Sequence, residues 1–287
     1  PGGLLQGAGD VVEETLYRTD SLAFNQKDEG KHSDLYVWPE TGVNYSMGYS
    51  NLGRLLQEAV QDWESALLTG CKGIPENLTQ LDQRTYVSGV LLSHQQEAPV
   101  FHHKTVLTPG QEFVPYHTQL AKLPNFPIPE TDPRFYQKGE KSEPLDLITR
   151  EEERFKVGVS LCFEQWYPHH WTRLAQNGAD FYVHLAGEGW YGNVGFQQFM
   201  ANVSRLRCIE NRKQAARCAN VGLSMFIDQL GHIHHKVKTG TIDPMTAELQ
   251  ASSFVSWYAR YPNWFPMLGL FAFLAGFIYY SRSTGFY

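Results

Sequence analysis

The sequence is poor in charge and in cysteine. Charged residues make up 19% of its 287 residues, the formal net charge is -6, and no cluster of lysine and arginine occurs. Binding to nucleic acid needs clustered cations, so we expect no nucleic-acid partner. The four cysteines form no CxxC pair and match no zinc spacing, so cysteine usage leaves the redox compartment open.

The chain also lacks an ordinary beginning and any evident internal repeat. It starts at Pro1 without a methionine or a signal sequence, which we interpret as a fragment or a processed start. Hydrophobic residues, in contrast, make up 42% of the chain and aromatic residues 14%. This composition predicts a folded globular protein that is long enough to bury a large core.

Short apolar runs alternate with amphipathic stretches along most of the chain. The runs 34–38 and 156–162 are predicted to be strands, and the stretches 52–68 and 196–216 are predicted to be helices. The stretch 120–153 is rich in proline and charge and is predicted to be mostly loop. Strands that alternate with helices indicate an α/β fold.

Three reactive side chains stand at the ends of predicted strands. Glu40, Lys104 and Cys162 occupy the positions where α/β folds place catalytic groups. Taken singly, each has a simpler explanation: a solvated loop acid, a surface lysine and a buried small hydrophobe. Taken together, they supply a base, a positive group for a developing oxyanion and a nucleophile, which acyl transfer needs. The backbone N–H of Phe163 is a further expected donor to the oxyanion.

The segments around these residues follow the order WPET, then HKTVLTPGQEFVP, then GVSLCFE. This order resembles the Glu-Lys-Cys triad of the nitrilase (carbon–nitrogen hydrolase) superfamily and, within it, the bacterial apolipoprotein N-acyltransferases. Their K-x-x-L-x-P-x-x-E segment is matched by residues 104–112, and their series of cysteine, aromatic residue and glutamate by residues 162–164. The resemblance covers roughly residues 34–240.

Further motifs of that family follow in the second half of the chain. Its W-F-G loop, R-x-R-A-x-E helix and A-N-x-G strand are resembled by residues 189–192, 205–210 and 219–224. Two places depart from the pattern: Gly187-Glu188 replaces the usual Asn-Asp, and Cys208 stands where an alanine is common. The first departure motivates one alternative function, a non-catalytic homologue that binds lipid or a partner.

The resemblance implies an α/β fold of the nitrilase type, an α-β-β-α sandwich in which residues 1–262 form the catalytic domain. It implies an N-acyltransferase in which Cys162 takes an acyl chain from a phospholipid as a thioester. The α-amine of a diacylglyceryl-cysteine at a lipoprotein N-terminus then attacks this thioester, and Glu40 serves as general base and then acid. A soluble amidase or nitrilase of the same superfamily, with water as acceptor, is the alternative activity.

The same resemblance implies supporting residues, partners and a location. Glu112 and Glu164 would orient the lysine and the cysteine of the triad, and Trp190 and Tyr191 would bind substrate. The histidines have no acidic or cysteine partner at ligand spacing, so we expect no metal and no cofactor. The implied partners are a phospholipid donor, a lipoprotein acceptor and the bacterial inner (cytoplasmic) membrane, with the catalytic domain on its periplasmic side.

Residues 263–287 form a separate apolar tail. The run 265–280 contains sixteen residues without a charge, and aromatic residues stand at both of its ends. As a helix the run would span about 24 Å, slightly less than a hydrocarbon core of about 30 Å, but flanking aromatic residues are typical of a membrane interface. We therefore expect a C-terminal transmembrane helix, with a buried C-terminal helix or a truncated hydrophobic tail as alternatives.

Overall fold

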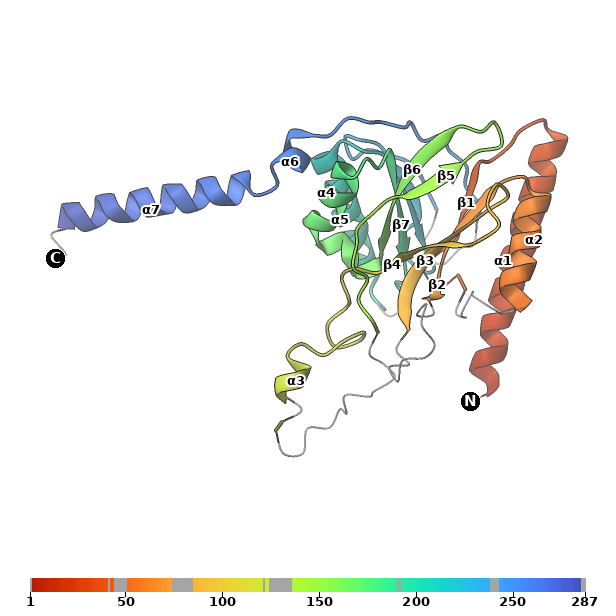
Figure 1. The fold of residues 1–287 in the computed structure, drawn as a ribbon, viewed down its shortest axis with the longest axis horizontal. Coiled ribbons are helices and arrows are strands. Elements are labelled where there is room, and N and C mark those ends of the chain that lie inside the picture. Colours follow the sequence, from red (N-terminus) through yellow and green to blue (C-terminus); the bar gives the residue numbers. More distant parts are fainter. Residues whose placement is uncertain are drawn as a thin grey trace.

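Two β-sheets packed face to face organise the chain (Figure 1). The computed structural model describes residues 2–40, 42–43, 51–73, 85–120, 122–123, 136–189, 192–237 and 243–284. Within them, the first sheet has the strand order β1 (Leu35–Val37), β2 (Ala66–Gly73), β3 (Tyr86–Ser93), β4 (Val100–His103). The second has the order β10 (Ile233–Lys236), β9 (Met225–Ile227), β8 (Ala215–Ala219), β7 (Phe181–Ala186), β6 (Arg154–Leu161), β5 (Leu145–Ile148). Strands β6, β7 and β8 run parallel and therefore end at one edge of their sheet.

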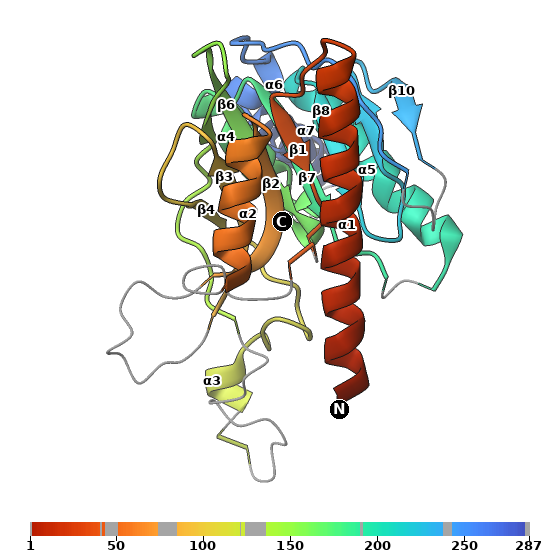
Figure 2. The same ribbon diagram turned by 90° about the vertical axis from the view of Figure 1, so that its right-hand side faces the viewer.

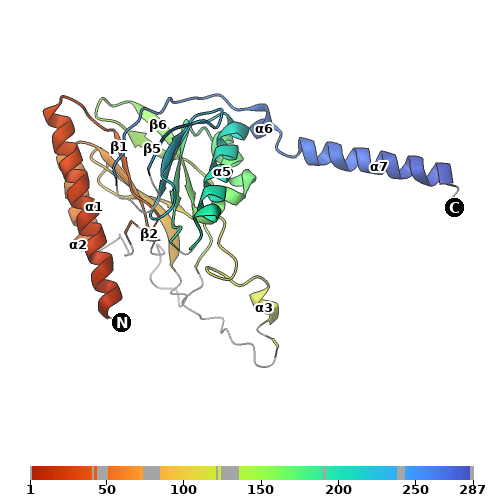
Figure 3. The ribbon, with the colours of Figure 1, turned by 180° about the vertical axis from the view of Figure 1, so that it is seen from behind.

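Helices cover the outer faces of both sheets (Figures 2 and 3). The first sheet carries α1 (Gly2–Asp28) and α2 (Asn51–Asp62), and the second carries α4 (Pro168–Gln176) and α5 (Val194–Asn211). The remaining helices are α3 (His117–Leu120), the 3-10 helix η1 (Cys162–Trp166), α6 (Trp257–Arg260) and α7 (Trp264–Thr284). The predicted α-β-β-α sandwich is confirmed.

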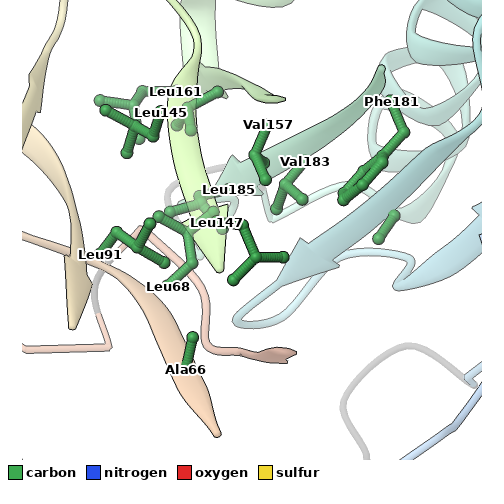
Figure 4. Close-up of a cluster of buried hydrophobic side chains, with 12 residues drawn as sticks. Ala66, Leu68, Leu91, Leu145, Leu147, Val157, Leu161, Phe181, Val183 and Leu185 are labelled. Atoms are coloured by element: carbon green, nitrogen blue, oxygen red, sulfur yellow. The ribbon is translucent and has the colours of Figure 1, made fainter. Parts of the chain in front are cut away.

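The central core lies between the two sheets (Figure 4). Leu68 and Leu91 of the first sheet meet Val159 and Leu185 of the second, and all four are fully buried. Burial of a side chain of this size contributes about 1.5–3 kcal/mol. At Gly89 the sheets approach so closely that an added Cβ would come within 3.1 Å of Val159. This packing fixes the strands whose ends carry the candidate site.

Two predicted helices are shorter than the sequence indicated. The stretch predicted at 52–68 leaves the helix at Asp62, turns at Glu64 with a φ of 53°, and continues as β2. The stretch predicted at 196–216 ends at Asn211, and Arg212 caps it with a φ of 57°. Helices commonly end at a glycine, or less often an asparagine, in this left-handed conformation. Here the left-handed residues are Glu64 and Arg212, so neither helix end carries that sequence signal. Strand β5 also lies in the stretch that was predicted to be mostly loop.

The C-terminal apolar run forms α7, which extends away from the sandwich (Figure 1). Its large apolar side chains are exposed, and Phe271 is 72% accessible. In the part of the chain that the structure describes, no helix is both long and apolar enough to cross a membrane. The transmembrane prediction is therefore not supported, because the uncharged run 265–280 would cover only about 24 Å and polar Ser281 and Arg282 follow it.

Candidate active site

The structure brings Glu40, Lys104 and Cys162 together. Glu40 lies three residues after β1, Lys104 directly follows β4, and Cys162 directly follows β6. The ammonium Nζ of Lys104 lies 3.2 Å from Oε1 of Glu40, and the side chain of Cys162 is close enough to lower the pKa of the same carboxylate, against the upward shift from burial. Side chains from both sheets thus meet at one place, as the order of the three segments predicted.

Lys104 is the cationic centre of the site and is fully buried. Besides Glu40, its Nζ donates to Oε1 of Glu112 at 2.7 Å, and Oε2 of Glu112 accepts the backbone N–H of Thr108 at 2.7 Å. Burial alone would lower the pKa of Lys104, but the charges of Glu40, Cys162 and Glu112 together raise it well above its ordinary value. Lys104 is therefore a permanent cation rather than an acid that releases its proton.

Cys162 is buried and carries a protonated thiol at neutral pH. Burial and the charge of Glu40 raise its pKa, Lys104 and the backbone N–H of Gly187 lower it, and the net pKa is about 12. Its backbone φ of 41° is left-handed, which is uncommon for a residue with a Cβ. This turn ends β6 and begins η1, so the thiol stands at the end of the sheet.

Hydrogen bonds to the carbonyl of the preceding residue fix the backbone at Glu40. The backbone N–H groups of Gly42 and Gly70 donate to the carbonyl of Pro39 at 2.9 and 3.2 Å. A Cβ on Gly70 would collide with the backbone of Glu40, so this position of β2 has no room for a side chain. Burial raises the pKa of Glu40, Lys104 lowers it, and Glu112 raises it, with a net upward shift. A raised pKa improves the match between a carboxylate base and neutral pH.

Glu164 supports the site through the backbone. Its Oε1 accepts the backbone N–H and hydroxyl of Thr105 at 2.6 and 2.8 Å, and the N–H of Val106 at 3.2 Å. Its Oε2 accepts the N–H of Leu161 at 2.8 Å. Despite complete burial, the nearby histidines and these donors hold its pKa well below the usual range. Glu164 thus ties the residues after Lys104 to the residue before Cys162.

Two histidines surround Glu164, although they are distant in sequence. One ligand atom each of His102, Glu164 and His170 lies within 4.8 Å of the others, a grouping that sequence spacing did not reveal. Nε2 of His170 faces the carbonyl of Val159 at 3.0 Å, and its Nδ1 lies 3.0 Å from the hydroxyl of Ser142. Because Glu164 also accepts four hydrogen bonds, we assign the cluster to hydrogen bonding and not to a metal.

The remaining predicted site residues lie at the ends of β6 and β7 or outside the described residues. Phe163 is the second residue of η1, directly after Cys162, and its ring contacts Tyr167 edge-on with the ring centroids 5.6 Å apart. Trp190 and Tyr191, predicted to bind substrate, lie outside the described residues. From the sequence, Gly187-Glu188 was only a departure from a family pattern. The proximity of the Gly187 N–H to the sulfur could not be predicted, because no local pattern aligns the ends of β6 and β7.

Comparison with known proteins agrees with this geometry. The family model "Carbon-nitrogen hydrolase" matches residues 12–259. An apolipoprotein N-acyltransferase from Chlorobaculum tepidum is 27% identical over 88% of this chain and 50% of its own length. One from Azotobacter vinelandii is 26% identical over 87% of this chain and 46% of its own length. The chain thus spans about half the length of the curated relatives it matches.

Solved structures show the same fold. A carbon-nitrogen hydrolase from Helicobacter pylori superimposes with a TM-score of 0.53 at 17% identity, covering 80% of this chain and 82% of its own. An amidase from Nesterenkonia sp. gives a TM-score of 0.56 at 14% identity, covering 79% and 81%. With the family model spanning most of the sequence and the sandwich fold shared, the chain belongs to the carbon-nitrogen hydrolase family.

Proposed function

We propose that this chain acts as an N-acyltransferase that moves an acyl chain from a phospholipid to the N-terminal amine of a diacylglyceryl-cysteine lipoprotein. The observation that carries the proposal is the ammonium of Lys104 at 3.2 Å from the Glu40 carboxylate, with Cys162 near enough to shift the pKa of both groups. Similarity to apolipoprotein N-acyltransferases supports the choice of this reaction over others that use a cysteine.

The first half of the reaction makes a thioester. Glu40 takes the thiol proton of Cys162, and the sulfur attacks the ester carbonyl of the phospholipid. The resulting oxyanion is stabilised by the ammonium of Lys104 and the backbone N–H of Phe163. When the tetrahedral intermediate collapses, the ester C–O bond breaks and Glu40 returns the proton to the leaving oxygen. A lysophospholipid leaves and the acyl chain stays on sulfur.

The second half transfers the chain to nitrogen. The lipoprotein amine attacks the thioester, Glu40 takes a proton from this nitrogen, and the C–S bond breaks to form an amide. The proton then returns to the sulfur of Cys162, which restores the starting state. Lys104 remains charged throughout, because its raised pKa prevents it from acting as a proton donor. Glu112 and Glu164 serve as positioning residues in this scheme.

The exposed apolar side chains of α7 support a membrane role for residues 263–287. We place residues 1–262 as the catalytic domain on the periplasmic side of the bacterial inner membrane, with the tail in contact with lipid. Trp190 and Tyr191 would line the lipid entrance. A phospholipid donor and a lipid-modified acceptor both reside in such a membrane, so contact with it would bring the substrates to Cys162.

Incubation with a fluorescent phospholipid, followed by mass spectrometry, tests the proposal. An acyl adduct on Cys162 that hydroxylamine removes, and that is absent in Cys162→Ala, is the expected result. Cys218→Ala is the matched control and should retain the adduct, since Cys218 lies on β8 outside the triad. Release of ammonia from small amides without an adduct would instead indicate an amidase. A folded protein with neither reaction would indicate a lipid-binding homologue.

A further inference from the structure

Gly187 brings a backbone N–H next to the candidate nucleophile. Strands β6 and β7 are parallel neighbours with Leu161 opposite Leu185, so the residues that follow them lie side by side. Cys162 directly follows the first strand and Gly187 directly follows the second. Burial raises the pKa of the Cys162 thiol and the backbone N–H of Gly187 lowers it, so this N–H lies close to the sulfur. A backbone N–H has a fixed direction, so its effect on the sulfur depends on how the peptide between residues 186 and 188 is held.

Hydrogen bonds on both sides of Gly187 join this peptide to residues 217–220. Asn220 accepts the backbone N–H of Glu188 on its side-chain oxygen at 2.8 Å, and its own N–H donates to the carbonyl of Ala186 at 3.2 Å. The carboxylate of Glu188 accepts a hydrogen bond from Nη2 of Arg217, which lies on the parallel neighbour β8. Gly187 is thus bracketed by two anchored residues.

The Glu188–Arg217 ion pair is fully buried, and both side chains have no measurable exposure. Arg217 is itself fixed, because Nη1 donates to the carbonyl of Leu223 at 2.5 Å and Nε to the hydroxyl of Ser204 at 3.3 Å. Burying two charges costs desolvation free energy that their attraction often fails to offset. A well-fixed buried pair beside the nucleophile is therefore better explained by the geometry that it imposes than by stability.

We propose that Glu188, Arg217 and Asn220 are positioning residues that hold the N–H of Gly187 on the sulfur of Cys162, where it stabilises the thiolate. The inference rests on the proposed role of Cys162 as nucleophile. The thiolate forms when the sulfur attacks the donor and forms again when it leaves the thioester. A donor on sulfur therefore assists both halves of the reaction, while Lys104 and Phe163 serve the carbonyl oxygen.

The charges around the sulfur have opposing effects, and the N–H acts among them. Glu40 and Glu112 raise the pKa of Cys162, whereas Lys104 and the Gly187 N–H lower it. The guanidinium of Arg217 also interacts with the thiolate. A test must therefore move the Gly187 peptide without changing any charge.

Gly222 provides such a test. A Cβ added there would collide with the Glu188 carboxylate, so Gly222→Ala displaces this side chain without altering a charge. Gly189→Ala is the matched control, because its added Cβ meets nothing closer than Val221 at 3.5 Å, an ordinary contact. The readout is the rate at which iodoacetamide alkylates Cys162, quantified by peptide mass spectrometry in the intact chain, with thermal unfolding to verify the fold.

We expect Gly222→Ala to slow alkylation by about threefold. A pKa higher by about one unit lowers the thiolate fraction about tenfold, and the greater nucleophilicity of that thiolate restores about threefold. N-ethylmaleimide, a larger reagent, should be slowed by the same factor, since a thiolate effect does not depend on reagent size. Gly189→Ala should react at the rate of the unsubstituted chain.

An unchanged alkylation rate in folded Gly222→Ala would overturn the inference, as would equal slowing in Gly189→Ala. If Gly222→Ala does not fold, Arg217→Lys replaces it, because lysine keeps the charge but loses the forked donors. Arg207→Lys is then the control, in an ion pair within α5. Unchanged alkylation in Arg217→Lys would also overturn the inference. Alkylation needs no acyl donor, so failure of the proposed acyl transfer would be seen separately.

Discussion

Replacing Lys104 by methionine removes the positive charge that lies between the carboxylates of Glu40 and Glu112. Methionine has a similar length and is apolar, so the cavity stays filled while the ammonium is lost. Nζ lies 3.2 Å from Oε1 of Glu40 and 2.7 Å from Oε1 of Glu112, which places those oxygens within about 6 Å of each other. At that separation two unit charges repel by about 3 kcal/mol at an effective dielectric constant of about 20.

We expect Lys104→Met to lower the free energy of unfolding by about 3–5 kcal/mol at pH 8, the usual result of leaving a buried charge without its partner. Burial already raises the pKa of Glu40, and Lys104 opposes that shift, so the substitution raises this pKa further. A carboxyl group with a raised folded-state pKa contributes stability below its unfolded pKa and loses it as pH rises through the folded pKa. The penalty should therefore shrink at pH 5, with a limiting slope of about 1.4 kcal/mol per pH unit for one proton.

Urea unfolding of both proteins at pH 8 and pH 5 measures the difference. Lys213→Met is the matched control, since Lys213 is also buried but donates to the carbonyl of Ser252 instead of a carboxylate. Its penalty should change little between the two pH values. A loss below about 1 kcal/mol for Lys104→Met at pH 8, or a loss of equal size at both pH values, would refute the charge assignment of the site.

Three further outcomes follow from the same contacts. Glu164→Gln replaces an acceptor of four hydrogen bonds and should lower the free energy of unfolding in urea by about 2–4 kcal/mol. The exposed control Glu152→Gln should change it by no more than about 0.5 kcal/mol. Equal losses in the two variants would contradict the role of Glu164 in joining the segments around Lys104 and Cys162. Gly70→Ala pushes on the backbone of the candidate base and should slow thioester formation at least about tenfold, measured in a single turnover; an unchanged rate would show that the base tolerates the shift. Deletion of residues 263–287 should abolish flotation with phospholipid vesicles and leave alkylation of the nucleophile unchanged, and retained flotation would remove the tail from the membrane role.

The local features of the site could be predicted from the sequence because short motifs encode them. Cys162 was predicted at the end of a strand, and β6 ends at the residue before it. Lys104 and Glu112 are eight residues apart and pair directly, as the segment resemblance implied. Each of these features depends on a few neighbouring residues, which the sequence displays in order. Their catalytic roles stay proposals.

The features that escaped prediction join distant parts of the chain. His170 lies beside Glu164 and His102, and Arg217 pairs with Glu188 across two strands. No hydrophobic period or spacing rule connects such positions, since only the sheet order brings them together. The two helices were predicted too long for another reason. Glu64, after α2, and Arg212, after α5, adopt left-handed conformations that the sequence does not signal.

The left-handed φ of Cys162 lowers the stability of the fold at the residue that carries the candidate nucleophile. A residue with a Cβ pays about 1–2 kcal/mol for this conformation, and glycine does not. Among inactive variants, Cys162→Gly should therefore unfold at higher urea than Cys162→Ala, by about 1 kcal/mol, which reverses the usual order of glycine and alanine. If alanine proves the more stable of the two, the strain is absent. If stability alone decided the residue at this position, glycine would be preferred. The cysteine therefore costs stability that only a function of its sulfur explains.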